Sequence, residues 1–242
     1  MGVGRCAVLV AAYNAAETLG PLLEDVRRHF TGDLILVDDG STDATGDIGG
    51  NLANVVLSHD TNRGKGAALI TGFTHLIGEG YQAVVTLDAD GQHLPEFIPR
   101  FIEMFERTGC DLVLGRREFS IRTTPFLRYF GNVLSSFWIS IISGVKVKDS
   151  QCGFRLYRLE AIQTQKLATS GFDTETELLF QIRQDGGRIE QVDIPLIYKA
   201  GGKSNFKRIW DTLAVTRVIV RHLLNWRRCR SGRGNRAGRS LN

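Results

Sequence analysis

Short, continuously apolar runs alternate with segments of helical periodicity through the first half of the chain. The apolar runs, each too uniformly apolar for a strand with one solvated face, lie at 7–11, 34–37, 55–57, 83–87 and 112–114. Between them, apolar residues recur at helical spacing over 18–30, 64–77 and 95–107. This alternation predicts an α/β fold through about residue 116, with helices covering both faces of a mainly parallel sheet.

Polar residues follow four of the five predicted strands. Because ligands of such sheets bind outside the carboxyl ends of the strands, these loops are expected to converge on one cleft. The loops read Tyr13-Asn14, Asp38-Asp39-Gly40-Ser41, Asp88-Ala89-Asp90-Gly91-Gln92 and Gly115-Arg116-Arg117.

The pattern changes beyond residue 116. An aromatic and aliphatic stretch at 126–145 precedes a predicted helix at 174–184 and a predicted strand that ends at Ile194. Serines interrupt the stretch at 126–145, which is shorter than the roughly 20 apolar residues that span a bilayer. It is expected to pack in the core or a dimer interface, or to insert aromatic side chains into a membrane surface. Those side chains are Phe126, Phe130, Phe137 and Trp138.

A last helical pattern runs from about 206 to 226, with apolar residues broadly on one side and arginines as their polar partners. It predicts either a helix docked on the core or one that lies in a membrane interface.

The composition is that of a globular protein, with 43% apolar and 23% charged residues, which excludes a disordered or fibrous chain. The formal charge is +4, yet residues 226–242 hold six arginines and no acid, so residues 1–225 carry a net charge of −2. The basic tail predicts an anionic surface nearby, or a solvated tail, rather than a nucleic-acid-binding body. Four cysteines without CxxC spacing and no signal-peptide pattern lead us to expect reduced thiols in the cytoplasm.

Asp88 and Asp90 form the sharpest local motif. If the strand at 83–87 continues, positions i and i+2 point to the same side, so both carboxylates can face one site. Mg²⁺ takes one or two such carboxylates and completes its shell with phosphates and water, and Gln92 can add a neutral oxygen. The alternative is a pair of solvated turn aspartates.

A second acidic loop follows the strand at 34–37. Its carboxylates can accept hydrogen bonds from a base or ribose, and at least one of four side chains is expected to cap local structure instead. The four are Asp38, Asp39, Ser41 and Asp43. The segment 62–66 then opens a helix whose free amides and Lys65 suit an anionic ligand. Neither a GxxxxGK[ST] nor a GxGxxG motif is present, which disfavours ATP hydrolysis of that type and a dinucleotide site.

Four of these motifs occur in a characteristic order and spacing: AAYN at 11–14, VDDGSTD at 37–43, NRGKG at 62–66 and DADGQH at 88–93. Together they resemble family 2 glycosyltransferases of the GT-A (Rossmann-like) fold. The run DSQCGFR at 149–155, with FDTETE at 172–177 and Ile194-Pro195, is similar to the dolichol-phosphate mannose synthase and dolichyl-phosphate glucosyltransferase subgroup.

The resemblance covers about residues 6–210. It implies a GT-A domain at 1–210, with a nucleotide-sugar-binding half at 1–116 and an acceptor-binding half at 117–210. An amphipathic helix and an Arg-rich tail follow at 211–242. Several relatives carry membrane spans in this region. The resemblance therefore implies that peripheral attachment to a membrane takes the place of these spans.

The resemblance also implies roles for single residues. Asp88, Asp90 and Gln92 would surround Mg²⁺ or Mn²⁺. Asp149, Arg155 and Arg117 would lie at the reacting centre, and Arg128 would meet the acceptor phosphate. The nucleotide-sugar would contact Ala11, Tyr13, Asn14, Asp39, Lys65, Asp88, Ala89, Arg116 and, by a looser match, Lys203. His93 would close the metal loop, whereas His29, His59, His75 and His222 are expected at the surface or in the core.

These features predict a metal-dependent, inverting transfer of a hexose from a GDP-mannose or UDP-glucose type donor to a polyprenyl phosphate at the cytoplasmic membrane face. A phosphate monoester has a second pKa of about 6 and needs no general base, so Asp149 is expected to orient or tune the site. The alternatives are a sugar-hydroxyl acceptor and a non-catalytic nucleotide-sugar-binding protein. A homo-oligomer is possible.

Overall fold

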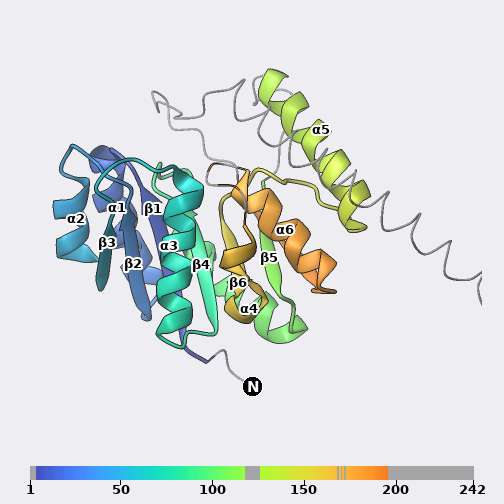
Figure 1. Ribbon diagram of the computed structural model, residues 1–242, viewed down its shortest axis with the longest axis horizontal. Coiled ribbons are helices and arrows are strands. Elements are labelled where there is room, and N and C mark those ends of the chain that lie inside the picture. The colour runs from blue at the N-terminus through green and yellow to red at the C-terminus, as the bar shows by residue number, and fades with distance from the viewer. Residues whose placement is uncertain (1–3, 118–125, 168, 170, 172, 196–242) are drawn as a thin grey trace, which may run out of the picture.

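The computed structural model describes residues 4–117, 126–167, 169, 171 and 173–195, and for 126–128 the backbone alone. These residues form one seven-stranded sheet with helices on both faces (Figure 1). In chain order the strands are β1 (Cys6–Ala12), β2 (Asp33–Asp38), β3 (Val55–Ser58), β4 (Ala83–Asp88), β5 (Leu112–Arg117), β6 (Arg155–Arg158) and β7 (Ile189–Ile194). The predicted α/β fold is confirmed.

The strand order across the sheet is β3-β2-β1-β4-β6-β5-β7. All neighbouring pairs are parallel except the two that β6 makes, with β4 on one side and β5 on the other. The sequence predicted every strand except β6, which is short and carries an arginine at each end. Residues of the second half of the chain thus lie inside the sheet that the first half begins.

Six α-helices lie within the described residues: α1 (Ala16–His29), α2 (Thr45–Leu52), α3 (Lys65–Gly78), α4 (Ile98–Thr108), α5 (Phe126–Ser143) and α6 (Thr174–Gln184). α6 has the bounds that the sequence predicted, and α1 and α3 agree within two residues. The first turn of the helix predicted at 95–107 is a separate 3₁₀ turn, Pro95–Phe97, and α4 ends at Gly109, whose φ of 62° is left-handed. Proline at the start and glycine at the end are the expected helix signals.

The sheet separates two apolar cores because successive side chains of a strand point to opposite faces. Ala7 and Leu9 of β1 belong to the core under α3 and α6, with Phe73 and Phe180. Val8 and Val10 belong to the core under α1 and α4. Figure 1 shows α3 and α6 on the face of the sheet nearest the viewer. This double coverage explains the continuously apolar strands.

The sequence did not predict α2, whose eight residues include three glycines. Glycine weakens a helix because its backbone loses more entropy on folding. Packing explains one of them, since a Cβ added to Gly49 would lie 2.1 Å from the Leu36 side chain. The close approach of α2 to β2 therefore requires glycine at that position.

α5 stands apart from the sheet in Figure 1, beyond α6. Six large apolar side chains at helical spacing are exposed on it: Phe130, Val133, Leu134, Phe137, Trp138 and Ile141. Ile139 is the one large apolar side chain of its described residues that is buried. Most of the described apolar side chains of the stretch at 126–145 are therefore not packed in the core, which leaves a dimer interface and a membrane surface as the predicted alternatives.

Among the helices that the structure describes, none has the length and apolarity needed to cross a membrane. The predicted helix at 206–226, the Arg-rich tail and Lys203 lie outside the described residues.

Candidate active site

The loops after β1 and β2 are tied to each other at the carboxyl end of the sheet. Ala11 and Ala12 pair in register with Asp88 and Asp38, which places the ends of β1, β2 and β4 side by side. The Asn14 backbone N–H donates to Ser41 Oγ at 2.9 Å, and Asn14 Oδ1 accepts from the Thr42 N–H at 2.9 Å. Asn14 has a φ of 48°. The expected convergence of these loops is confirmed.

Two acidic residues after β2 have structural roles. Asp38 accepts the Ser41 N–H at 3.0 Å. Asp43 accepts the first amide of α1, from Ala16, at 3.1 Å, and the first amide of α2, from Thr45, at 3.0 Å. These bonds satisfy amides that a helix start leaves without partners and lower the pKa of Asp43 despite its desolvation. The expectation that at least one of the four polar side chains is structural is confirmed.

Asp39 is buried and held by three donors. Its carboxylate accepts the N–H groups of Arg63 and Gly64 at 2.9 and 2.8 Å, and His59 Nδ1 lies 2.6 Å from Oδ1. His59 Nε2 lies 2.9 Å from Thr71 Oγ1 of α3. Because a carboxylate only accepts, Nδ1 carries the proton. Asp39 therefore clamps the 62–64 loop beside β2.

Sequence reasoning missed the role of His59. The residue is separated from Asp39 by 20 positions, and its short strand β3 gives no periodic signal that would reveal its partner. The only available sign was its position, directly after the strand that neighbours β2.

Asp88 ends β4 and faces Lys65, the first residue of α3. Lys65 Nζ lies 2.5 Å from Asp88 Oδ1 and 2.9 Å from Glu175 Oε2 in the first turn of α6. The lysine charge keeps the pKa of Asp88 well below its usual range although burial opposes this. Lys65, which the NRGKG motif predicted to suit an anionic ligand, is thus paired with two carboxylates of the protein itself.

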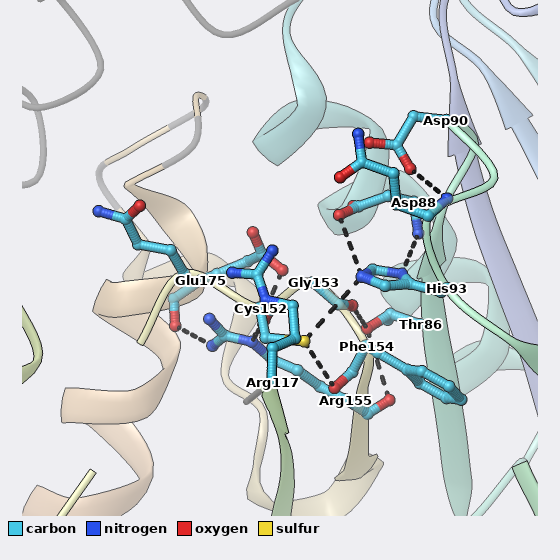
Figure 2. Close-up of polar contacts among 12 residues, drawn as sticks. Thr86, Asp88, Asp90, His93, Arg117, Cys152, Gly153, Phe154, Arg155 and Glu175 are labelled. Carbon is cyan, nitrogen blue, oxygen red and sulfur yellow. Dashed lines mark hydrogen bonds and ion pairs between the residues drawn. The ribbon is translucent and has the colours of Figure 1, made fainter. Parts of the chain in front are cut away.

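Asp90 and His93 complete the loop after β4 (Figure 2). Asp90 Oδ1 accepts the Gln92 N–H at 2.9 Å, while partial desolvation and the charge of Asp88 raise the pKa of Asp90. His93 is buried, and desolvation lowers its pKa. Its Nδ1 accepts the Asp88 N–H at 3.2 Å, so the ring braces the end of β4 from beneath.

Gly153 lets the segment before β6 approach Asp88. A Cβ added there would lie 2.4 Å from Asp88 Oδ2, so the close contact requires glycine. The sequence motif DSQCGFR contained this residue, but nothing in it indicated contact with a carboxylate 65 positions earlier.

The two aspartates fit a Mg²⁺ or Mn²⁺ ion. Such ions take one or two protein carboxylates and fill their remaining positions with phosphate oxygens and water. Among the described residues there is no group of three or more His, Cys, Asp or Glu side chains that could hold a metal ion alone. Asp88 and Asp90, close enough to perturb each other, therefore offer half of a shell that a diphosphate would complete.

Asp149 and Arg117 form a buried pair opposite Asp88. The Asp149 side chain is 0% exposed, and its carboxylate accepts Arg117 Nε at 2.7 Å, Nη2 at 3.1 Å and the Arg117 backbone N–H at 3.2 Å. The Gln151 N–H donates to it as well, at 3.2 Å. Asp149 thus fixes the guanidinium of Arg117 at the end of β5, as expected for an orienting residue.

Arg155 is 1% exposed and begins β6. Its Nε, Nη1 and Nη2 donate to the backbone carbonyls of Cys152, Glu175 and Ser150 at 2.7, 2.8 and 2.8 Å. Figure 2 shows the guanidinium on the Glu175 side of the site. These contacts indicate that Arg155 positions the 149–153 segment and α6, and its expected place at the reacting centre stays a prediction.

The other expected site residues differ in position. Arg116 points to the opposite side of β5 from Arg117 and pairs with Asp193 of β7. Tyr13 is exposed and Ala89 is buried at the turn. Arg128 lies in α5 with its side chain outside the described part of the chain.

α5 carries a serine-lined face toward the Asp149 segment. Ser136 Oγ donates to Ser150 Oγ at 3.1 Å and accepts the Ser150 N–H at 3.0 Å. Ser135 Oγ lies 3.1 Å from Ser150 Oγ, and Ser140 bonds both the N–H and the carbonyl of Val147. The segment that bears Asp149 is therefore hydrogen-bonded to one face of α5, and the other face of this helix is apolar and exposed.

The family model "Glycosyl transferase family 2" matches residues 7–165. The chain is a family 2 glycosyltransferase. The match includes all four motifs from AAYN to DADGQH and the DSQCGFR run, so it confirms the family that the resemblance implied.

Relatives of this glycosyltransferase act in different organisms. It is 33% identical over 215 residues to the undecaprenyl-phosphate mannosyltransferase of Micrococcus luteus, covering 83% of this chain and 86% of that protein. It is 28% identical to the UDP-N-acetylglucosamine–dolichyl-phosphate N-acetylglucosaminyltransferase of Methanococcus voltae, covering 79% and 85%.

Among solved structures, the fold of this glycosyltransferase is similar to that of glucosyl-3-phosphoglycerate synthase from Mycobacterium tuberculosis in complex with Mn²⁺, UDP and glucosyl-3-phosphoglycerate. The TM-score is 0.66 at 21% identity, over 91% of this chain and 79% of that one. This likeness confirms the GT-A fold.

Proposed function

We propose that this glycosyltransferase transfers a hexose, with inversion, from a nucleoside-diphosphate sugar to a polyprenyl phosphate. The observation that carries the proposal is the Arg117–Asp149 pair, read beside the similarity to relatives whose names specify undecaprenyl and dolichyl phosphate. Asp149 cannot accept a proton without weakening its hold on Arg117. An acceptor that is already anionic needs no such base.

In the reaction, a phosphate oxygen of the acceptor attacks the anomeric carbon. The bond from that carbon to the diphosphate oxygen breaks, and the nucleoside diphosphate leaves with both electrons. Arg117 is placed to meet phosphate, because a guanidinium offers paired donors of fixed geometry and Asp149 restricts its rotamers. Asp149 acts through Arg117 and is a positioning residue.

Asp88 and Asp90, with Gln92, would hold Mg²⁺ or Mn²⁺. When bound, the ion offsets the charge that develops on the leaving diphosphate. His93 and Gly153 keep Asp88 in place: the ring accepts the Asp88 N–H, and the glycine leaves room for the carboxylate.

The donor is proposed to lie over the ends of β1, β2 and β4. The 1–116 half supplies Ala11, Tyr13, Asn14, Asp39, Lys65, Asp88, Ala89 and Arg116. The 117–210 half would supply the acceptor contacts, with Arg128 at the acceptor phosphate, and it would add Lys203 to the donor contacts. The names of the two relatives above specify different sugars. An assay is therefore needed to determine whether the donor is of the GDP-mannose or the UDP-glucose type.

The membrane surface is proposed as the place of the reaction, at its cytoplasmic face. The exposed side chains of α5, among them Phe130 and Phe137, form an apolar face that suits the interface of a lipid bilayer. The same helix is hydrogen-bonded to the segment that bears Asp149. Contact of α5 with the membrane would therefore bring Arg117 near a lipid-linked phosphate.

The first experiment measures transfer of labelled sugar into an organic-extractable lipid. Purified protein is incubated with undecaprenyl or dolichyl phosphate, Mg²⁺ or Mn²⁺, and a panel of GDP- and UDP-sugars. We expect label from one donor that EDTA abolishes and that Asp90→Ala reduces by about a hundredfold or more. The matched control is Asp47→Ala, an exposed carboxylate on α2, which should retain full activity.

The outcomes separate the alternatives. Lipid product from no donor, despite metal-dependent nucleotide binding, would refute the polyprenyl-phosphate acceptor. A pH–rate profile of Asp149→Asn that keeps the wild-type shape supports a phosphate acceptor. Loss of the acid-side limb, on which a general base becomes protonated, would instead favour a sugar-hydroxyl acceptor deprotonated by Asp149.

A further inference from the structure

Lys65 bridges two carboxylates that belong to different elements. It opens α3, and its Nζ lies 2.5 Å from Asp88 Oδ1 at the end of β4 and 2.9 Å from Glu175 Oε2 in α6. The Lys65 side chain is 17% exposed, Asp88 27% and Glu175 7%. The ammonium group therefore occupies the position beside Asp88 that a cation bound there would need.

A divalent ion and the Lys65 ammonium compete for the same oxygen. Mg²⁺ binds carboxylate oxygens at about 2.0–2.1 Å, and two cations that share one oxygen repel each other strongly in a partly desolvated site. Gly153 borders both oxygens of Asp88, because a Cβ added there would lie 2.4 Å from Oδ2 and 2.5 Å from Oδ1, so the chain crowds the carboxylate on that side. Binding of an ion at Asp88 thus requires Lys65 to move.

Glu175 has the capacity to receive Lys65 when it moves. Its Oε1 is buried and has no hydrogen-bond partner within the described residues. Arg155 lies 3.7 Å from Oε1 but directs its three nitrogens to backbone carbonyls, one of them that of Glu175. The carboxylate is therefore fixed in place, with one oxygen that accepts no hydrogen bond within the described residues.

We propose that Lys65 is a resident counter-ion that holds Asp88 in the metal-free protein, and that Glu175 retains Lys65 when a divalent cation displaces it. This inference rests on the metal site of the proposed function. Glu175 is then a positioning residue: it prevents the lysine from competing fully with the ion, and it keeps the ammonium close to the bound diphosphate.

The proposal is tested first by thermal unfolding with Mn²⁺ alone. In EDTA, Lys65→Met should lower the Tm by roughly 5 °C, because Asp88 and Glu175 lose their shared cation. Mn²⁺ should restore most of that loss and shift the wild-type Tm much less. The matched control is Arg158→Met, which breaks a 3.0 Å ion pair with Asp111 and should lose stability that Mn²⁺ does not restore.

The second test measures free Mn²⁺ by electron paramagnetic resonance during titration of the protein. Glu175→Gln should weaken Mn²⁺ binding about tenfold, because Lys65 then pairs with Asp88 alone. In a Lys65→Met background the same substitution should have no further effect.

Two results would overturn the proposal. The first is a Lys65→Met protein that Mn²⁺ stabilises no more than the wild type, or that stays unfolded with the ion present. The second is an equal effect of Glu175→Gln with and without Lys65. Neither result depends on the acceptor. If Mn²⁺ restores the Tm of Lys65→Met but the protein transfers no sugar to lipid, the proposed function alone is refuted. If sugar transfer is normal but Mn²⁺ does not restore the Tm, the displacement of Lys65 by the ion alone is refuted.

Discussion

Carboxylates on the two sides of this active site are held by different kinds of donor. After β2, Asp38, Asp39 and Asp43 bond to backbone N–H groups of the loops around them. Around β5 and β6, Asp149 and Glu175 pair with the side-chain cations Arg117 and Lys65. The first region relies mainly on main-chain donors, with the His59 side chain added at Asp39, and the second mainly on ion pairs, with two backbone N–H groups added at Asp149.

This difference separates a rigid surface from one that can exchange partners. A backbone donor moves only when its whole loop moves, whereas a lysine or arginine can rotate to a new anion. The β2 side is therefore suited to a constant group such as a nucleotide. The β5–β6 side is suited to charges that arrive and leave, as the metal, the diphosphate and the acceptor phosphate do.

The largest effect is expected where the ion-paired region is deepest. Asp149→Ala leaves the Arg117 guanidinium without its anion, and breaking one partner of a buried pair costs about 3–5 kcal/mol. Urea unfolding measures the loss. Asp149→Asn, which keeps the size and one acceptor oxygen, should cost clearly less; equal losses would mean that the charge alone, rather than packing or the remaining acceptor oxygen, holds Arg117.

A smaller effect is expected in the backbone-held region. Asp39→Asn replaces one acceptor oxygen by an NH₂ group that faces the N–H of Gly64 or the ring of His59. Charge-assisted hydrogen bonds of this kind are worth about 1.5–3 kcal/mol. The loss should appear in urea unfolding with little change in Mn²⁺ affinity; a matching fall in Mn²⁺ affinity would show that the two regions are coupled.

Ser136→Ala tests whether the Asp149 segment depends on α5. The substitution leaves the buried Ser150 N–H without its acceptor, which should cost about 1–2 kcal/mol. We also expect a higher KM for the lipid acceptor with the KM for the donor unchanged. Ser143→Ala on the same helix, which bonds only to Val145, is the control and should alter neither constant.

The smallest effect is expected at the neighbour of Arg117. Arg116 pairs with Asp193, whose side chain is 53% exposed, and exposed pairs contribute about 0–1 kcal/mol. Arg116→Ala should thus change stability by less than 1 kcal/mol in urea unfolding. A fall in donor affinity measured on the same protein would then reflect contact with the donor rather than a damaged fold.

The sequence predicted the sheet and the polar loops because their signals are local. Buried parallel strands are continuously apolar, and α6 has both an apolar period and acidic residues in its first turn. The placement of Asp38, Asp39, Asp88 and Asp90 after strands followed from the same pattern.

Long-range partners were not predictable in this way. Lys65 and Glu175 are 110 positions apart, and Asp39 and His59 follow separate strands, β2 and β3. β6 has four residues with an arginine at each end, so its burial depends on insertion between β4 and β5 rather than on its own composition. The partners of Arg155 were not predictable for the same reason: only its neighbours in the fold show that its guanidinium bonds backbone carbonyls inside the protein.

The central position of β6 also bears on how the protein is synthesised. β4 and β5 emerge from the ribosome about 70 and 40 residues before the strand that joins them, so both expose an unpaired edge until Arg155–Arg158 is made. A fragment that stops before β6 should aggregate, and its β5 would lack the neighbour that connects it to β4. The two halves of the sheet are thus joined from inside by β6, before β7 completes the edge beside β5.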